Sequence, residues 1–325
     1  MTNFKYFQDQ LKNLNQGDFD SFAMELFHFQ AVNNPVYANY LKFLKIDHLV
    51  INSIIEIPFL PISFFKKLEV KSGDWEPEVT FESSGTTSKT RSRHYLNDLN
   101  YYHQHAERLF QNEFGNLSGH ITLALLPSYL ERANSSLVSM VSYFIDKSKS
   151  GSGFYLDNYY DLKSIIEANQ GQKIILWGVT FALLEFAQFG TNLDGCTVIE
   201  TGGMKGRGPE LVRQDLYDRL RTAFSIKNIY SEYGMTELLS QSYATNGSFR
   251  NSLSMKILLR DVNDPFSYVL QGKTGGVNVI DLANIHSCAF IETQDLGRYT
   301  SETNFEIVGR FDNSDVRGCN LLLIE

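Results

Sequence analysis

Apolar positions over the first 57 residues recur at helical spacing. Phe22, Leu26 and Phe29 follow one another every three or four positions, which is the period of a helix with one buried face. Prolines from position 58 onward end this pattern, because proline does not continue a helix. We expect a helical opening, followed by a short strand in F-F-K-K-L-E-V-K-S-G at 64–73.

From residue 79 the pattern changes to short apolar runs separated by longer stretches of helical spacing. The runs lie at 121–126, 173–178, 196–200 and 225–230. Runs of this length, rich in Ile, Leu and Val and separated by helices such as 97–113 and 209–223, are typical of buried parallel strands. The pattern predicts an α/β fold of layered sheets and helices.

After about residue 245 the helical stretches give way to strands, with turns expected at Asn246-Gly247, Asn263 to Pro265 and Gly275-Gly276. We therefore divide the chain into three parts. These are a helical segment packed on the core (1–78), an α/β core (79–245) and a smaller β-rich lobe (246–325).

Composition and charge exclude several classes of protein. The chain is 43% hydrophobic with a formal charge of -8, so it is neither disordered nor a nucleic-acid binder. It has no apolar run of about 18 residues and no signal core at its start, which predicts a cytoplasmic protein without membrane insertion. Its three cysteines lack the spacing of a zinc site or a disulfide framework.

The stretch F-E-S-S-G-T-T-S-K-T-R-S-R at 81–93 is the first candidate for chemistry. A loop of hydroxyl residues and glycine after a strand can surround an anion with side-chain and backbone donors. Without other features it is equally consistent with a polar surface loop. The candidate donors are Ser83, Ser84, Gly85, Thr86 and Thr87, and the candidate phosphate cations are Lys89, Arg91 and Arg93.

Three later segments carry groups that suit a nucleotide. In Y-S-E-Y-G-M-T-E at 230–237, Tyr233 and Gly234 could meet a base, and Thr236 a phosphate. Glu237 could hold Mg²⁺, which prefers carboxylates combined with phosphate oxygens; the alternative is a solvated charge at a strand-to-helix turn. T-G-G at 201–203 offers the side-chain-free backbone of Gly202 and Gly203, and Q-D-L-G at 294–297 places Asp295 for ribose hydroxyls.

The order of these segments, followed by G-R-F-D at 309–312, resembles the adenylate-forming superfamily of acyl-CoA synthetases and luciferases. Within it the chain is most similar to the LuxE-like acyl-protein synthetases of bacterial luminescence. That similarity rests on I-P-F-L-P-I-S-F-F-K-K at 57–67, L-L-P-S-Y-L-E-R at 125–132 and V-R-G-C at 316–319, together with the loops above.

The resemblance implies the large N-terminal domain of an adenylate-forming enzyme, whose core binds nucleotide and acyl group. It implies a ligase that uses ATP and Mg²⁺ to convert a carboxylic acid, expected to be a fatty acid, into an acyl-adenylate. The resemblance implies that Ser84, Thr86 and Thr87 contact the pyrophosphate and that Tyr233, Gly202 and Gly203 contact the adenine. It implies that Thr236 contacts the α-phosphate and that Glu237 holds the magnesium. Asp295 would then bind the ribose, and Arg310 the ribose or a phosphate.

The resemblance also implies where the acyl group goes. In the LuxE-like group, which also has a short ending, it is passed to a cysteine near the C-terminus, and Cys319 matches; the alternative is that Cys319 is a small buried residue. The chain ends at Glu325, soon after Asp312, so we expect the lid of about a hundred residues to be absent. Possible partners are an acyl reductase, an acyltransferase or a carrier protein. The alternative functions are a ligase that acylates CoA or a carrier protein, and a non-catalytic subunit of an acyl-transfer complex.

Overall fold

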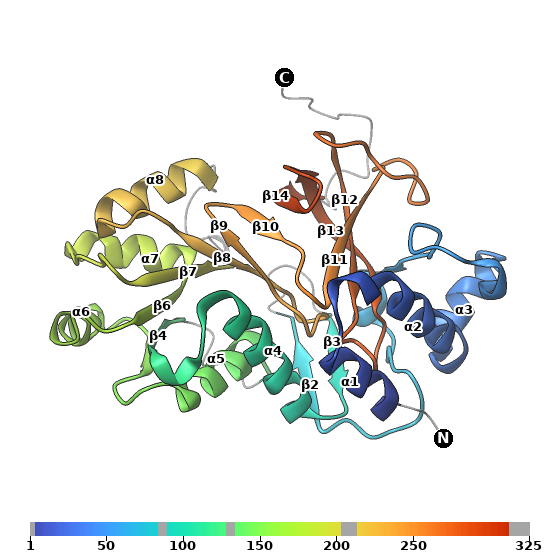
Figure 1. Ribbon diagram of the computed structural model, residues 1–325, viewed down its shortest axis with the longest axis horizontal. Helices are drawn as coiled ribbons and strands as arrows, with labels where there is room; N and C mark the ends of the chain where they lie inside the picture. Colours follow the sequence, from blue (N-terminus) through green and yellow to red (C-terminus); the bar gives the residue numbers. More distant parts are fainter. Residues whose placement is uncertain (1–3, 84–89, 128–133, 203–212, 312–325) are drawn as a thin grey trace.

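The computed structural model describes residues 4–83, 90–127, 134–202 and 213–311 (Figure 1). One large sheet runs through the molecule, with helices on both faces of one half and the N-terminal helices against the other half. Besides the α-helices and strands named below, the described residues contain short 3-10 helices. These are η1 Gln16–Asp18, η2 His48–Val50, η3 Ile62–Lys66, η4 Leu117–Gly119 and η5 Ala187–Phe189.

The predicted helical opening consists of α1 (Phe4–Lys12), α2 (Phe19–Asn33) and α3 (Pro35–Phe43). Asn34 separates the last two, and its side chain caps α3 by accepting from the Tyr37 backbone N–H at 3.0 Å. These helices pack on the C-terminal lobe. In α2, the Gln30 amide nitrogen donates to the Asn284 carbonyl at 2.8 Å, and its amide oxygen accepts from the Ala289 N–H at 2.9 Å.

The middle of the chain forms the parallel half of the sheet, in the order β5, β4, β6, β7, β8. Helices α4 and α5 contact each other on one face, whereas α6, α7 and α8 gather around η5 on the other. The strands are β4 Ile121–Leu125, β5 Gly153–Tyr155, β6 Ile174–Val179, β7 Thr197–Thr201 and β8 Tyr230–Tyr233. The helices are α4 Leu99–Phe114, α5 Ser136–Lys147, α6 Tyr159–Ala168, α7 Thr180–Phe186 and α8 Arg213–Phe224.

From β8 onward the sheet is antiparallel, in the order β8, β9, β10, β14, β13, β12, β11. A two-residue strand, β1 (Leu60–Pro61), pairs with β13 in parallel. The strands are β9 Ser242–Thr245, β10 Ser248–Arg250, β11 Met255–Arg260, β12 Thr274–Asp281, β13 Phe290–Tyr299 and β14 Asn304–Arg310. A separate hairpin pairs β2 (Val79–Glu82) with β3 (Arg93–Leu96). The α/β class and the β-rich C-terminal lobe are confirmed.

Three of the expected local structures are wrong. Residues 62–66 form η3 and no strand follows it in 64–73. The run 225–230 is mostly the connection that follows α8, and the strand begins only at its last residue, as β8 (Tyr230–Tyr233). Gly275 and Gly276 lie within β12 and not in a turn. A Cβ on Gly276 would come within 2.5 Å of the Arg260 guanidinium carbon, so Gly276 makes room for a buried arginine.

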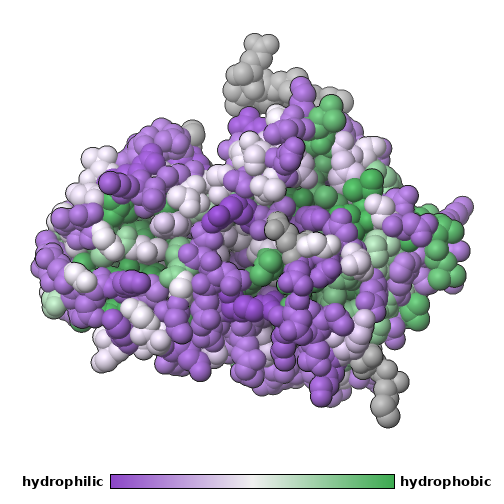
Figure 2. All heavy atoms as spheres, in the orientation of Figure 1, coloured by the Kyte–Doolittle hydropathy of each residue, from purple (hydrophilic) through white to green (hydrophobic). Residues whose placement is uncertain are grey.

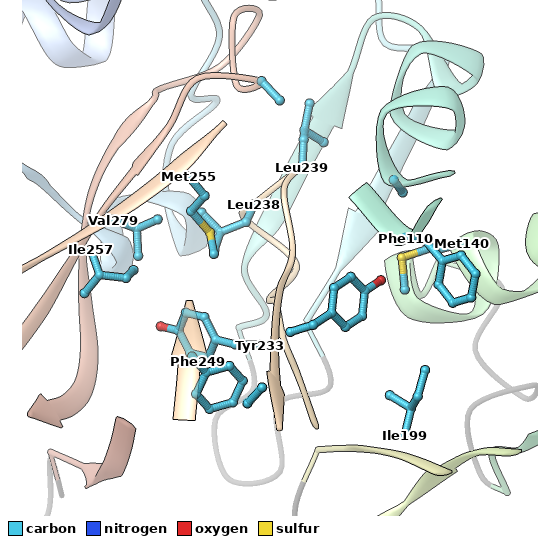
Figure 3. Close-up of a cluster of buried hydrophobic side chains, with 14 of the residues drawn as sticks. Phe110, Met140, Ile199, Tyr233, Leu238, Leu239, Phe249, Met255, Ile257 and Val279 are labelled. Carbon is cyan, nitrogen blue, oxygen red and sulfur yellow. The ribbon is translucent and has the colours of Figure 1, made fainter. Parts of the chain in front are cut away.

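Apolar side chains fill the space on both sides of the central strands (Figure 3). Phe110 and Met140 come from α4 and α5, and Met255 and Val279 come from β11 and β12. Tyr233 on β8 lies beside Phe249, on the same side of the central strands as Met255. The helical and β-rich parts therefore share one continuous core.

Exposed apolar side chains gather over the N-terminal helices, at the right edge of Figure 2. Phe43 is 84% exposed and Leu49 72% exposed, so this patch contrasts with the hydrophilic surface over most of the same view. None of the helices in the described part of the chain is both long and apolar enough to cross a bilayer.

Candidate active site

Tyr233 and Asp295 meet where the parallel strands end. Tyr233 is the last residue of β8, and its hydroxyl donates to Asp295 Oδ2 at 2.9 Å. Its ring packs edge-on against Phe249, with centroids 5.9 Å apart (Figure 3). It also packs edge-on against Phe305, with centroids 6.2 Å apart. In open α/β sheets, ligands bind beyond the carboxyl ends of the strands, where the topology changes. Here the parallel half of the sheet gives way to the antiparallel half at this point.

Arg310 completes this group from the neighbouring strand. Asp295 on β13 and Arg310 on β14 are direct cross-strand partners, and Arg310 Nε lies 3.6 Å from Asp295 Oδ1. Burial raises the pKa of Asp295, and the Arg310 charge and the Tyr233 hydroxyl offset part of that rise. Burial, followed by the Asp295 carboxylate, raises the pKa of Tyr233 well above its ordinary value. Tyr233 therefore stays a neutral hydrogen-bond donor at every physiological pH.

Glu237 lies in the loop between β8 and β9 and is only 4% exposed. Burial raises the pKa of this carboxyl group; a hydrogen bond with Ser92 and the positive charge of Arg310 offset part of the rise, and the charge of Asp295 adds to it. A buried carboxyl group without a fully paired cation is costly. Its neighbours place Glu237 beside both the Asp295–Arg310 pair and the hairpin β2–β3.

The β12 end fixes the backbone of this loop. Asp281 Oδ2 accepts from the N–H groups of Leu239 at 2.7 Å and Ser240 at 2.9 Å, while Oδ1 accepts from the Ser240 hydroxyl at 2.6 Å. The Asn284 side-chain amide donates to the Glu237 carbonyl at 2.8 Å. These bonds hold the main chain immediately around and after Glu237 from the side of the β-rich lobe.

The base of the hydroxyl-rich loop is held against the β8–β9 loop that carries Thr236 and Glu237. Ser83 and Ser92 bond to each other twice across the hairpin, both at 3.0 Å: the Ser83 N–H donates to the Ser92 carbonyl, and the Ser92 N–H donates to Ser83 Oγ. His94 is 1% exposed, and its Nδ1 lies 2.8 Å from the Thr236 carbonyl oxygen, which requires Nδ1–H as the donor. His94 thus connects the hairpin to Thr236.

The candidate cations Arg91 and Arg93 are engaged elsewhere. Arg91 Nη1 lies 3.4 Å from Glu82 Oε2 in a partly exposed ion pair, and the Arg93 guanidinium lies 5.7 Å from the centre of the Tyr95 ring. The cation whose charge reaches Glu237 and Asp295 is Arg310. Phosphate contacts by Arg91 or Arg93 would therefore require these side chains to leave their present partners.

Two carboxyl groups that the sequence did not single out lie on β7 and β8. Glu232 Oε2 accepts from the Thr201 hydroxyl at 2.5 Å. Glu200 accepts from the hydroxyls of Thr180 and Ser231. A Cβ on Gly234 would lie 2.3 Å from Glu232 Oε1, so glycine at 234 leaves room for this carboxyl group.

Glu232 gives the protein a pH-dependent stability. Burial, with a further contribution from the Glu200 charge, raises the pKa of Glu232 to about 7, against about 4.3 for an unfolded chain. The folded state then holds a proton that the unfolded state has lost, so stability falls as pH rises from about 4.3 to 7, by up to about 1.4 kcal/mol per pH unit.

Replacing Glu232 by glutamine is expected to remove that slope. Urea unfolding between pH 4.5 and 7.5 measures it: the free energy of unfolding of Glu232→Gln, relative to the wild type, should increase steadily with pH. Parallel curves for the two proteins would mean that Glu232 titrates normally.

The residues present suit a nucleotide with its divalent cation. No group of three His, Cys, Asp or Glu side chains in the described ranges could hold a metal without help. Glu237 supplies one buried carboxylate, and Mg²⁺ is commonly held by one or two carboxylates together with substrate phosphates and water. Neutralising Glu237 in this way would also relieve the cost of ionising it in a buried position.

The structure brings six of the predicted site residues into one neighbourhood and leaves others untested. Ser83, Tyr233, Thr236, Glu237, Asp295 and Arg310 lie in segments joined by the contacts above. Gly202 follows β7, and Gly234 follows Tyr233. Ser84, Gly85, Thr86, Thr87, Lys89, Gly203 and Cys319 lie outside the described residues, as does the expected helix start at Pro209.

Sequence reasoning missed three residues that hold the site together, Ser92, Asp281 and Asn284. Each stands near a recognised motif or at the end of an apolar strand, as in V-N-V-I-D at 277–281. An acidic residue that ends an apolar run, with an asparagine three residues later, is a signal that could have been noticed. It is usually read as a turn.

Comparison with known proteins identifies the fold. No protein-family model matches the sequence, and no curated protein matches it either. A 2-hydroxyisobutyryl-CoA ligase in complex with 2-HIB-AMP matches with a TM-score of 0.70 and 13% identity, over 90% of this chain and 67% of that one. An ATP-bound RpMatB-BxBclM chimera matches with a TM-score of 0.55 and 14% identity, over 73% of this chain and 49% of that one.

A third structure agrees with these two. The O-succinylbenzoate coenzyme A synthetase from Bacillus subtilis, in complex with AMP, has a TM-score of 0.51 and 17% identity, over 73% of this chain and 49% of that one. This chain thus spans about half to two thirds of the length of the structures it matches. At such low identity the likeness identifies the fold, which is that of the large N-terminal domain of adenylate-forming enzymes.

Proposed function

We propose that this chain, with the fold of adenylate-forming ligases, uses ATP to convert a carboxylic acid into an acyl-adenylate and pyrophosphate. One observation carries the proposal. The hairpin base at Ser83, the loop with Thr236 and Glu237, and the cross-strand pair Asp295–Arg310 come from distant parts of the sequence. The hydrogen bond between His94 and Thr236 joins the hairpin to the loop, and the hydrogen bond between Tyr233 and Asp295 joins the strand before that loop to the pair. These are the segments whose order along the chain resembles the adenylate-forming superfamily.

The chemistry requires charge neutralisation and alignment. A carboxylate oxygen of the acid attacks the α-phosphorus of ATP, a new O–P bond forms, and the bond to the bridging oxygen breaks, so that pyrophosphate leaves with that electron pair. Because the attacking group and the phosphate are both anionic, the protein must supply positive charge and hydrogen-bond donors. Arg310 is the cation beside the site, and Thr236, with the hydroxyls of 83–87, would supply donors.

The other residues would hold the nucleotide. Asp295 would accept from the ribose hydroxyls, and its position is fixed by Tyr233 and Arg310. The backbone at Gly202 and Gly203 would take the adenine together with Tyr233. Glu237 would hold Mg²⁺, which supplies positive charge to the phosphates when it is bound.

Exchange of labelled pyrophosphate into ATP tests the proposal directly. Exchange requires reversible formation of the acyl-adenylate, and it should appear only when a suitable acid is added. A panel of fatty, hydroxy and aromatic acids should give exchange with at least one class. If no acid supports exchange at millimolar ATP, the proposal is wrong and the chain is better explained as a non-catalytic subunit.

For the second half-reaction we propose transfer of the acyl group to the thiol of Cys319, as in LuxE-like acyl-protein synthetases, with a fatty acid as substrate. Attack by a thiolate on the acyl carbonyl carbon would form a thioester and release AMP. The other two cysteines are poor candidates, because burial raises the pKa of Cys196 to about 11 and that of Cys288 to about 12. A cytoplasmic partner, such as a reductase, an acyltransferase or a carrier protein, would then take the acyl group.

Replacement of Cys319 by serine separates the two acceptors. We expect Cys319→Ser to abolish hydroxylamine-sensitive labelling of the protein by a radioactive fatty acid and ATP, while acid-dependent pyrophosphate exchange continues within about twofold of the wild type. Cys196→Ser is the matched control and should label normally. If Cys319→Ser is still labelled, or if it turns over fully with CoA as the acyl acceptor, a ligase that acylates an external thiol would be favoured.

A further inference from the structure

The end of β14 that carries Arg310 has few ladder partners. β11, β12, β13 and β14 lie side by side in the orange-to-red part of the sheet (Figure 1). The β13–β14 pairing shifts register after Leu296, and the pairs Leu296–Gly309 and Asp295–Arg310 lie on the Arg310 side of the shift. β10 pairs with residues 304–305, at the other end of β14. An irregularity of this kind interrupts the ladder and bends the strand, so the position of Arg310 depends on further contacts.

Phe311, the residue after Arg310, supplies two of these contacts. Its backbone N–H donates to the Gln294 carbonyl at 2.7 Å. The Arg260 guanidinium lies over its ring, with the central guanidinium carbon 5.6 Å from the ring centre. A guanidinium over an aromatic face is attracted to the ring, and the attraction grows when water is excluded. Because Arg260 is only 5% exposed and Phe311 is half-buried, this contact is partly shielded from water.

The Arg260 side chain is held in one place by β12 and β13. Its Nη1 donates to the Val277 carbonyl at 3.1 Å and to Asn278 Oδ1 at 2.9 Å. Its Nη2 donates to the Thr293 carbonyl at 2.9 Å and lies 3.4 Å from Glu292 Oε1. Several fixed partners allow a planar guanidinium only one orientation. Arg260 is therefore a rigid support for the ring that rests on it.

Arg260 and Arg310 lie on opposite faces of the sheet. Residues that pair across successive strands point to one face, and neighbours along a strand point to opposite faces. Four successive cross-strand partners share the face of Arg260; they are Arg260, Gly276, Leu296 and Gly309. Phe311 follows Gly309 by two residues and points to the same face, whereas Arg310 points to the other face with its partner Asp295.

Arg260 also supports Asp295 from behind. The Thr293 carbonyl accepts from Arg260, and the Thr293 hydroxyl accepts from the Asp295 N–H at 3.1 Å. Burial raises the pKa of Asp295, and the Arg310 charge, the Tyr233 hydroxyl and the Arg260 charge offset part of that rise. The arginine on the far face thus has contacts that lead to both members of the Asp295–Arg310 pair.

We infer that Arg260 is a positioning residue of the proposed nucleotide site and that it acts through Phe311. With the Phe311 ring stacked on Arg260, the end of β14 stays against β13, and Arg310 stays beside Asp295, where the ribose or a phosphate would lie. Arg260 itself is on the opposite face and does not touch the nucleotide. The inference rests on the proposed function, because the ligand of Arg310 is taken from it.

Calorimetric titration of the full chain with ATP and Mg²⁺ tests the inference without requiring catalysis. Phe311→Leu keeps an apolar side chain but removes the ring, and it should weaken ATP binding about five- to tenfold. Phe311→Tyr keeps the ring and should bind ATP within about twofold of the wild type. Phe266→Leu is the matched control, because Phe266 is another aromatic residue of the β-rich lobe, is 54% exposed and should not affect the site.

Combined variants separate positioning from a general loss of stability. If Phe311 acts through Arg310, Phe311→Leu should weaken ATP binding less than about twofold further once Arg310 has been replaced by alanine. A purely structural role would weaken binding by the same factor in both backgrounds. Arg260→Lys keeps the charge but loses the planar stacking surface, so adding Phe311→Leu to it should also cost less than about twofold.

The outcomes distinguish this inference from the proposed function. Wild-type affinity in Phe311→Leu, or the same loss with and without Arg310, would overturn the positioning role and leave adenylation intact. If Phe311→Leu weakens ATP binding as expected but no acid supports pyrophosphate exchange, the positioning role stands and adenylation is wrong. A wild-type protein that does not bind ATP would overturn both.

Discussion

Replacing Glu237 by glutamine is expected to lower acid-dependent pyrophosphate exchange by about 100- to 1000-fold, the usual loss when one electrostatic group of an active site is removed. Glutamine keeps the shape of the side chain and can still bond to Ser92, but it cannot offer an anion to a divalent cation. The initial rate of exchange at saturating acid, measured across a range of Mg²⁺ concentrations, checks this expectation.

The same variant should have the opposite effect on stability. Burial raises the pKa of Glu237, so in the free protein this group contributes stability at low pH that is lost as pH rises through its folded pKa. Glutamine stays neutral at every pH. The urea midpoint of Glu237→Gln at pH 8 should therefore equal or exceed that of the wild type, although the variant has lost nearly all of its pyrophosphate exchange.

Glu82→Gln is the matched control for this experiment. Glu82 lies on the same hairpin as Ser92, but its carboxylate forms a partly exposed ion pair with Arg91, so exchange should change less than about twofold. A Glu237→Gln protein that retains a tenth or more of wild-type exchange would remove Glu237 from the proposed metal site.

Replacing Asp281 by alanine is expected to destabilise the protein by about 3–5 kcal/mol. Its carboxylate is fully buried and accepts from the backbone N–H groups of Leu239, Ser240 and Ala283 as well as from the Ser240 hydroxyl. Removing the acceptor leaves these donors buried and unpaired, and each such group costs about 1–3 kcal/mol before the structure relaxes. Urea unfolding at constant pH measures the loss.

Asp281→Asn separates the effect on the site from the effect on folding. Asparagine keeps one acceptor oxygen and nearly the same volume, so we expect a smaller loss of stability. Exchange should still fall about tenfold or more, because the loop that carries Glu237 would shift; misplacement by about 1 Å can cost 100-fold in rate. Asp264→Ala is the control, since Asp264 also accepts from a backbone N–H but lies in an exposed turn. An Asp281→Ala protein within 1 kcal/mol of the wild type would contradict this account.

Those parts of the candidate site that depend on local pattern could be predicted from the sequence. Asp295 and Arg310 lie on either side of a short turn, and two strands around such a turn must pair, which brings the two residues side by side. Likewise, apolar runs separated by helices predicted β4, β6 and β7 within a residue or so, because a strand buried on both faces has a continuous apolar sequence.

What the sequence could not predict depends on contacts between distant segments. Arg91 and Arg93 follow a hydroxyl-rich loop, yet Glu82 and Tyr95 on the hairpin itself engage them. Glu232 gives no sign of its altered pKa, because that shift comes from burial beside β7. Gly275-Gly276 has the composition of a turn, but both residues pair with neighbouring strands, and the missing Cβ of Gly276 leaves room for the Arg260 guanidinium.

The contacts of Gln30 have a consequence for the order of folding. Gln30 bonds to Asn284 and Ala289, more than 250 residues later in the chain, so α2 cannot dock until almost the whole described sequence has been synthesised. Until then its apolar side chains, including Phe22, Leu26 and Phe27, have no final partner, and such a surface is prone to aggregation. Asn284, which completes those contacts, also donates to the carbonyl of Glu237. Asn284 therefore connects the docked position of the first helices with the main chain of the Glu237 loop.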